Sequence, residues 1–226
     1  RRRGCLCVSV QLGCCAGGCS MGYHHAGFQV VGLDIEPQPH YPFEFHLGDM
    51  LTCSLDGFDA YHASPPCGAH SLASQQWRKA GKVYPSLIEP MRERLRATGK
   101  PWVIENVVGA PLVNPTLLNG AFFGLNLRRR RLFETSFPVA LPLLPVEGRT
   151  GFRMRSAPRS EQDPVVPVGH FPGVEKARQM MGCPWMTQKE LAQAIPPVYT
   201  EYIGRCLRQY IEADAAMIVE GVRDAP

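Results

Sequence analysis

Residues 6–34 read LCVSVQLGCCAGGCSMGYHHAGFQVVGLD. An apolar run leads into a glycine-rich turn, a short helical stretch follows, and a second apolar run ends at Asp34. We predict a strand over 6–12, a helix over 20–26 and a strand over 28–33. Together they would form a βαβ unit, the building block of a parallel sheet covered by helices.

The same alternation continues along the chain. Apolar runs predict strands over 43–46, 58–63 and 101–105, and helical spacing predicts helices over 86–98, 175–181 and 197–219. Residues 137–173 contain many prolines and little periodicity, which indicates an irregular insertion. The fold class that we predict is therefore α/β, with an open sheet and a small irregular segment.

Length and composition set the broad class. The 226 residues fit one α/β domain with a small appendage, and a net charge of +4 permits a polyanionic partner without requiring one. Five of the nine cysteines lie within residues 5–19, where their spacing matches neither a disulfide framework nor a zinc knuckle. We expect free thiols, no metal site, no membrane-spanning segment and a cytoplasmic protein that is not secreted.

Chemically useful side chains follow four of the predicted strands. Asp34, Asp49, Cys67 and Glu105 each stand where an apolar run ends. Ligands of open α/β sheets bind beyond the carboxyl ends of the strands. We therefore expect these four residues to form one site.

Two of these residues carry reactive chemistry. Two prolines precede Cys67 and fix the backbone, so its thiol would be held rigidly as a nucleophile; the alternative is a buried structural cysteine. Glu105 emerges from an apolar strand, where burial raises a carboxyl pKa toward neutrality, or it could be the partner of a structural arginine. Arg129 and Arg131 would point to one face of a strand and steady a carboxylate, a base or a phosphate, unless they form a solvated basic surface.

The first turns of the fold suggest a nucleotide site. Ala16, Gly17 and Gly18 would let a ligand approach the backbone at a helix start, although a plain tight turn has the same sequence. Asp34 is placed to bind ribose hydroxyls, and Ile35 offers an apolar surface for an adenine.

Taken together, these segments resemble the cytosine-5 DNA methyltransferases, in particular short, phage-type members. The matching segments, in chain order, are Gly13–Gly18 (GCCAGG), Pro65-Pro66-Cys67, Glu105-Asn106-Val107, Arg129-Arg130-Arg131 and Ala192–Pro196 (AQAIP). Their order and spacing span nearly the whole chain.

The resemblance implies a class I, Rossmann-like fold that binds S-adenosylmethionine and methylates a cytosine flipped out of double-stranded DNA. It implies that the catalytic residues are Cys67, Glu105, Arg129 and Arg131, and that the cofactor contacts Ala16, Gly17, Gly18, Asp34, Ile35, Asp49, Met50 and Pro66. Residues 4–136 would form the catalytic domain, 137–173 a short target-recognition segment, and 174–226 the closing helices. The recognition segment would contact phosphates through Arg149, Arg153, Arg155 and Arg159. We expect a monomer.

The sequence departs from the family pattern at five positions. Gln11, Gly13, Cys15, Gly68 and Gln193 stand where the family has Asp, Phe, Gly, Gln and Asn. Loss of the Phe would remove a surface that stacks on adenine, and Gly68 would loosen the catalytic loop. Two alternatives therefore stay open: a degenerate homologue that binds DNA without turnover, and an RNA or modified-cofactor transferase acting on pyrimidine C5.

Overall fold

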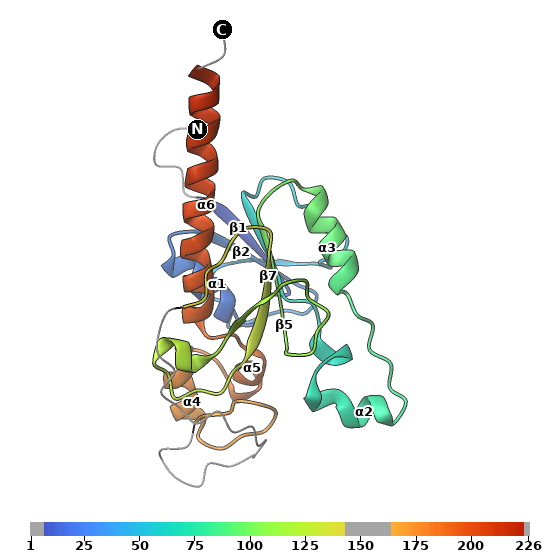
Figure 1. Cartoon of the computed structure of the whole chain (residues 1–226). Helices are drawn as coiled ribbons and strands as arrows, with labels where there is room; N and C mark the ends of the chain where they lie inside the picture. The colour runs from blue at the N-terminus through green and yellow to red at the C-terminus, as the bar shows by residue number, and fades with distance from the viewer. Residues whose placement is uncertain (1–6, 143–163, 224–226) are drawn as a thin grey trace.

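The structure, a computed structural model, describes residues 7–142 and 164–223. Its centre is a seven-stranded sheet with the order β3-β2-β1-β4-β5-β7-β6 (Figure 1). The strands are β1 (Val8–Leu12), β2 (Gln29–Asp34), β3 (Glu44–Leu47), β4 (Ala60–Ala63), β5 (Trp102–Asn106), β6 (Thr116–Leu118) and β7 (Arg131–Thr135). The first five strands are parallel, and β7 runs antiparallel to both β5 and β6.

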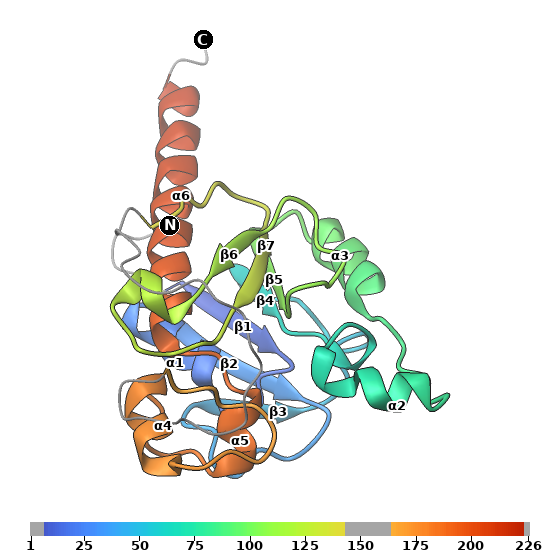
Figure 2. The same cartoon turned by 60° about the horizontal axis from the view of Figure 1, so that its bottom comes forward.

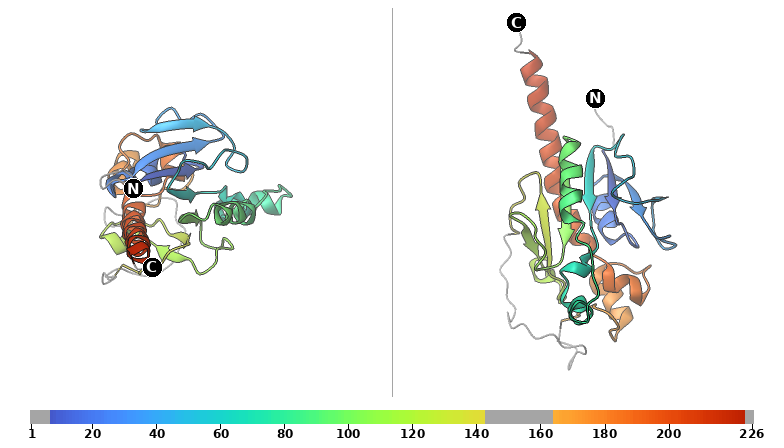
Figure 3. Two further views of the ribbon diagram at one scale, coloured as in Figure 1. Left: turned by 90° about the horizontal axis from the view of Figure 1, so that it is seen from above. Right: turned by 90° about the vertical axis from the view of Figure 1, so that its right-hand side faces the viewer.

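Helices cover both faces of this sheet, and further helices lie beyond the carboxyl ends of its strands (Figures 2 and 3). They are α1 (Gly18–His25), α2 (Gln75–Lys79), α3 (Ile88–Ala97), α4 (Val174–Met181), α5 (Gln188–Gln193) and α6 (Pro197–Arg223), with 3₁₀ turns η1 (Cys67–Ala69), η2 (Leu72–Ser74) and η3 (Gly120–Phe123). Among the described helices, none combines the length and apolar character that crossing a bilayer requires.

Successive side chains of a strand point alternately into two hydrophobic cores, one on each face of the sheet. In β5, Val103 packs into the core formed with α1 and α6, and Ile104 packs into the core formed with α3. Both side chains are fully buried. This period-two pattern is what a sheet covered on both faces requires.

A third core anchors α4 and α5 beside the carboxyl ends of the strands. It joins Ala177 and Leu191 of these helices to Ala16 of the turn after β1. The indole of Trp185 also donates a hydrogen bond of 2.8 Å to the carbonyl of Ala16. The C-terminal segment is thereby tied to the turn that follows the first strand.

The structure contains every predicted strand and helix, with ends displaced by one or two residues, and α6 continues to Arg223. One placement is wrong: β7 begins at Arg131, so Arg129 lies outside the strand that was expected to carry both. Residue 6 of the first predicted strand, Cys5, and residues 143–163 of the insertion lie outside the described residues, as do Arg149, Arg153, Arg155 and Arg159.

Candidate active site

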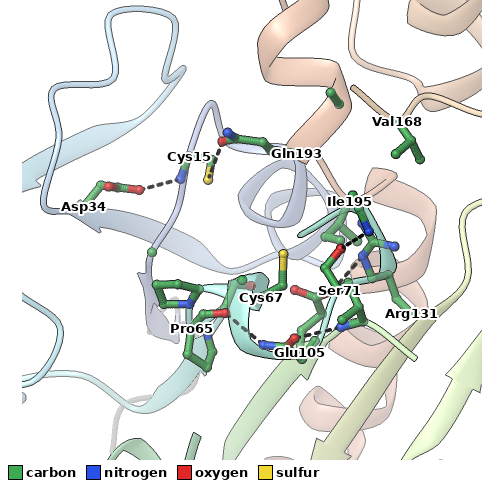
Figure 4. A pocket seen from close by; sticks show the side chains of 18 of the residues that line it. Cys15, Asp34, Pro65, Cys67, Ser71, Glu105, Arg131, Val168, Gln193 and Ile195 are labelled. Carbon is green, nitrogen blue, oxygen red and sulfur yellow. Dashed lines mark hydrogen bonds and ion pairs between the residues drawn. The ribbon is translucent and has the colours of Figure 1, made fainter. Parts of the chain in front are cut away.

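A cleft of about 1530 Å³ lies at the carboxyl ends of the parallel strands. The structure brings Asp34, Asp49, Cys67 and Glu105 to its walls, together with Arg129 and Arg131 (Figure 4). The strand ends thus meet at one site, as the sequence pattern predicts. A cleft of this size has room for more than one ligand group.

Cys67 lies on an exposed turn that is hydrogen-bonded to the neighbouring strand. It is the first residue of η1, directly after Pro66, and its thiol is free and exposed. The side-chain amide of Asn106 donates a hydrogen bond of 2.8 Å to the carbonyl of Pro65 (Figure 4). This hydrogen bond joins the Pro-Pro-Cys turn to β5, and because Cys67 is exposed the alternative of a buried structural cysteine is wrong.

Glu105 is buried on β5 and aimed at the cleft. Its Oε1 lies 3.1 Å from Nε of Arg131 at the start of β7. Burial raises the pKa of Glu105, while Arg131, a hydrogen bond from Ser64 and Arg129 oppose that rise. The direction matches the expectation of a carboxyl suited to exchange a proton, and the arginine partner that we considered as the structural alternative is present as well.

Arg129 is enclosed by protein, and only 2% of its surface is exposed. Its guanidinium donates hydrogen bonds of 2.8–2.9 Å to the carbonyls of Pro167, Ala192 and Ala194. Three of its five N–H groups are therefore used within the protein, and contact between Arg129 and a base stays a prediction. In this structure Arg129 joins the segment before β7 to the segment around α5.

The opposite wall of the cleft is acidic and partly apolar. Asp34 accepts hydrogen bonds from the backbone amides of Cys15 and Glu36, at 2.9 and 3.2 Å. Ile35 beside it is 70% exposed, an unusual state for a large aliphatic side chain. Asp49 is exposed too, and its Oδ1 accepts the amide of Leu51. A ligand with an apolar face and hydrogen-bond donors matches this wall.

Met50 and Pro66 complete the set of predicted cofactor residues on the cleft, whereas Ala16, Gly17 and Gly18 do not line it. The two glycines serve packing instead. A Cβ on Gly17 would meet Pro42 at 2.7 Å, and one on Gly18 would meet the carbonyl of Ile195 at 2.3 Å. The turn approaches the cleft through Gly13 and Cys15.

These two positions are also where the turn departs from the family pattern. Gly13 has a φ of 74°, and a Cβ there would lie 2.8 Å from both the Met50 methyl group and the Ser64 carbonyl oxygen. A Phe side chain does not fit this backbone, and Met50 occupies the space beside it. Cys15 adopts a φ of 44°, a left-handed conformation that costs energy for a residue with a side chain.

The segment after Cys67 is tied together more closely than its glycine suggested. Gly68 makes room for the Tyr84 ring, because a Cβ would lie 2.5 Å from it. Arg78 donates to the carbonyls of Gly68 and Ser71 at 2.7 and 2.8 Å. The roles of Arg78 and Tyr84 cannot be predicted from the sequence, since loop contacts leave no periodic signal.

Two polar residues near Glu105 were not among the predicted site residues. Ser64, which lines the cleft, and His62, buried in β4, form a hydrogen-bonded pair at 3.1 Å. The signal was available: a histidine within an apolar strand is unusual and demands a partner.

Within residues 7–142 and 164–223, no group of three or more histidine, cysteine or acidic side chains is arranged to hold a metal ion. The thiols of Cys14 and Cys15 have raised pKa values, mainly because they are buried, and the pKa of Cys15 rises to about 12. These thiols therefore stay protonated near neutral pH.

No protein-family model matches the sequence, and no curated protein is similar enough to count as a match. Solved structures do match. An Escherichia coli prophage protein described as a DNA modification methyltransferase superposes with a TM-score of 0.66 at 14% identity, over 91% of this chain and 99% of that one. Two further methyltransferases match: Entamoeba histolytica EhMeth, with a TM-score of 0.61 at 9% identity, and S. pombe Dnmt2, with a TM-score of 0.57 at 11% identity. Each match covers 92% of this chain and 99% of the other chain. The fold is therefore the Rossmann-like α/β fold of S-adenosylmethionine-dependent methyltransferases.

Proposed function

We propose that this protein is a DNA (cytosine-5)-methyltransferase that uses Cys67 as its nucleophile. The observation that carries the proposal is the presence of two functional groups on one cleft, at segments joined by a hydrogen bond. An exposed thiol and a buried, arginine-paired carboxyl line the same cleft, and the hydrogen bond between Asn106 and Pro65 joins their turns. A nucleophilic thiol and a carboxyl that can exchange a proton, both on the same cleft, are the two groups that attack on a pyrimidine ring requires.

The acidic wall fits S-adenosylmethionine as the cofactor. Asp34 and Asp49 would accept hydrogen bonds from the ribose and the adenine amine, and the exposed Ile35 would pack against the adenine ring. Met50 and Pro66 add apolar contacts. Carboxylates also suit a cofactor that carries a sulfonium charge. When bound, S-adenosylmethionine supplies an electrophilic methyl group.

The residues of this chain would act in sequence on the flipped cytosine. The Cys67 sulfur, as thiolate, attacks C6 of the ring and forms a covalent bond, while the electron pair of the C5–C6 double bond shifts through C4 onto N3. Glu105, in its protonated form, gives its proton to N3 and accepts a hydrogen bond from the exocyclic amine, so that the developing negative charge is neutralised. Arg131 keeps the Glu105 carboxyl in place. After C5 is methylated, loss of the C5 proton restores the double bond and releases Cys67.

Exposed basic side chains at the cleft suit the nucleic acid. Arg130 and Lys189 are exposed and line the cleft. Their positive charges attract a negatively charged backbone. Double-stranded DNA is the substrate that we propose, with the monomer as the active unit.

Transfer of a tritiated methyl group from S-adenosylmethionine to duplex DNA tests this proposal. We expect incorporation as 5-methylcytosine by the wild type, loss to background in Cys67→Ala, and full activity in Cys206→Ala, which removes a partly buried thiol of α6. Parallel reactions with RNA test whether DNA or RNA is the substrate. Label in RNA alone would overturn the DNA assignment, and no label in either polymer would favour a binding protein without turnover.

A further inference from the structure

The loop after β3 folds into a tight turn at the cleft, residues 49–53, which we call the Asp49 turn. The carbonyl of Asp49 accepts hydrogen bonds from the amides of Thr52 and Cys53, at 3.1 and 2.9 Å. One carboxylate oxygen, Oδ1, accepts the amide of Leu51 at 2.8 Å. The other, Oδ2, has no hydrogen-bond partner among the described residues, and Asp49 is exposed on the cleft. The turn therefore presents one free acceptor to a ligand.

Side chains from two other elements hold the Asp49 turn and the residues that follow it. A guanidinium nitrogen of Arg94, on α3, donates a hydrogen bond to the carbonyl of Cys53 and lies 3.8 Å from the sulfur of the same residue. The hydroxyl of Tyr61, buried in β4, donates to the carbonyl of Leu55 at 2.6 Å. Four side chains of this loop also pack against the core on the α3 side of the sheet: Met50, Leu51, Cys53 and Leu55. The loop is thus fastened to two elements that lie later in the chain.

The place of the Arg94 guanidinium is costly in itself. Its Nε is buried and has no hydrogen-bond partner among the described residues. A buried donor without an acceptor lowers stability, and a charged group pays more than a neutral one. Arg96, on the same helix, is exposed and avoids this cost. The position of Arg94 is therefore better explained by the carbonyl that it holds, at the end of the Asp49 turn, than by the stability of α3.

We propose that Arg94 is a positioning residue for recognition of the cofactor's adenine, because it fixes the turn that presents the free oxygen of Asp49. Arg94 acts through the backbone at Cys53. The exocyclic amine of adenine is a donor that a carboxylate accepts, whereas hypoxanthine has a carbonyl oxygen at that position and offers no such donor. The held turn would therefore favour adenine over hypoxanthine. This role rests on the proposed function, in which Asp49 meets the adenine amine.

Calorimetric titration of the full chain tests the role with two ligands, S-adenosylhomocysteine and S-inosylhomocysteine, in which hypoxanthine replaces adenine. We expect the wild type to bind the adenosyl compound about 10- to 100-fold more tightly, the value of a hydrogen bond to a charged group. Arg94→Met keeps an aliphatic stem but removes the donor, and this preference should fall about fivefold or more. Arg94→Lys keeps a charged donor and should retain most of it. Asp49→Ala gives the preference that remains without the acceptor.

Amide hydrogen exchange of the protein without ligand, measured by NMR, tests the anchor separately from the ligand. The amides of Leu51 and Cys53 are the probes, because both donate within the Asp49 turn. We expect Arg94→Met to speed their exchange about tenfold, since local opening costs less once the carbonyl of Cys53 is released. Arg96→Met is the matched control on the exposed side of α3, and it should match the wild type in exchange and in ligand preference.

Three results would overturn the role. If Arg94→Met keeps the wild-type preference for the adenosyl compound, Arg94 does not position the adenine contact, even where the amides of the turn exchange faster. If the wild type binds both compounds equally, Asp49 does not recognise the amine, although methyl transfer itself can still stand. If the wild type binds neither compound, the proposed cofactor fails, and the role of Arg94 fails with it.

Discussion

His62→Gln should remove a large part of the acid sensitivity of this fold. His62 lies within β4 and is 2% exposed, and burial lowers its pKa to about 3. In the unfolded chain an ordinary histidine has a pKa of about 6.5. Between these two values the unfolded chain binds a proton that the folded protein does not.

The sign of the effect follows from that difference. The stability associated with a neutral, buried His62 is fully present above about pH 6.5 and is lost progressively as the pH falls toward 3. Between pH 7 and pH 5 the loss amounts to about 2 kcal/mol of unfolding free energy. Glu105, whose pKa is raised, has the opposite sign, since its folded form gains stability as the pH falls.

Urea denaturation at pH 7 and pH 5, followed by circular dichroism, measures this effect. The wild type should lose about 2 kcal/mol more than His62→Gln over this interval, because the glutamine cannot bind a proton. His46→Gln is the matched control, since His46 is exposed on β3 and its removal should leave the wild-type dependence. Equal losses in the wild type and His62→Gln would refute the assignment of a neutral, buried histidine.

Three further predictions concern packing, strain and binding. Glu134→Gln should destabilise the protein by about 2–3 kcal/mol in urea denaturation, because it leaves the buried Arg92 with only the exposed carboxylate of Glu89, whereas Glu201→Gln, at a surface pair, should cost less than about 1 kcal/mol. Cys15→Gly should raise the unfolding free energy by up to about 1 kcal/mol, since glycine tolerates a φ of 44°. A lower unfolding free energy in this variant would show that the Cys15 backbone is not strained. Trp77→Ala should weaken duplex binding about tenfold in fluorescence polarisation, because this 55% exposed ring lies on the projecting α2 and can stack on a base; unchanged affinity would exclude that contact.

The sequence predicts the strand ends well because their placement follows from local pattern and topology alone. Asp34, Asp49, Cys67 and Glu105 each terminate an apolar run, and parallel strands deliver such residues to one edge. The raised pKa of Glu105 follows from the same pattern, since a carboxyl at the end of a buried strand is desolvated.

What the sequence does not predict depends on contacts between distant segments. Arg129 lines the cleft, but the local pattern does not predict that three of its N–H groups bind carbonyls more than thirty residues away. Gly18 was expected to face a cofactor, yet it makes room for Ile195. The sequence predicts that Gly13, in place of the family Phe, removes a surface that stacks on adenine. The structure adds that the Met50 side chain occupies the space next to Gly13, which the sequence does not show.

The division into a catalytic domain, a recognition segment and closing helices stays a prediction. The helices α4 and α5 pack on the turn after β1, and α6 packs on α1, so these C-terminal elements share hydrophobic cores with the residues of the N-terminal half. A target-recognition role for residues 137–173 can be examined by exchanging them while Cys67 and Glu105 are retained.

Covalent trapping tests the central claim most directly. A duplex that contains 5-fluorocytosine within the methylated sequence blocks the loss of the C5 substituent, so the enzyme stays attached to the ring once it has attacked C6. With S-adenosylmethionine present, we predict a complex that survives denaturation, and peptide mapping by mass spectrometry should place the cytosine on Cys67. Absence of the complex, attachment at another cysteine, or its persistence in Cys67→Ala would contradict the account.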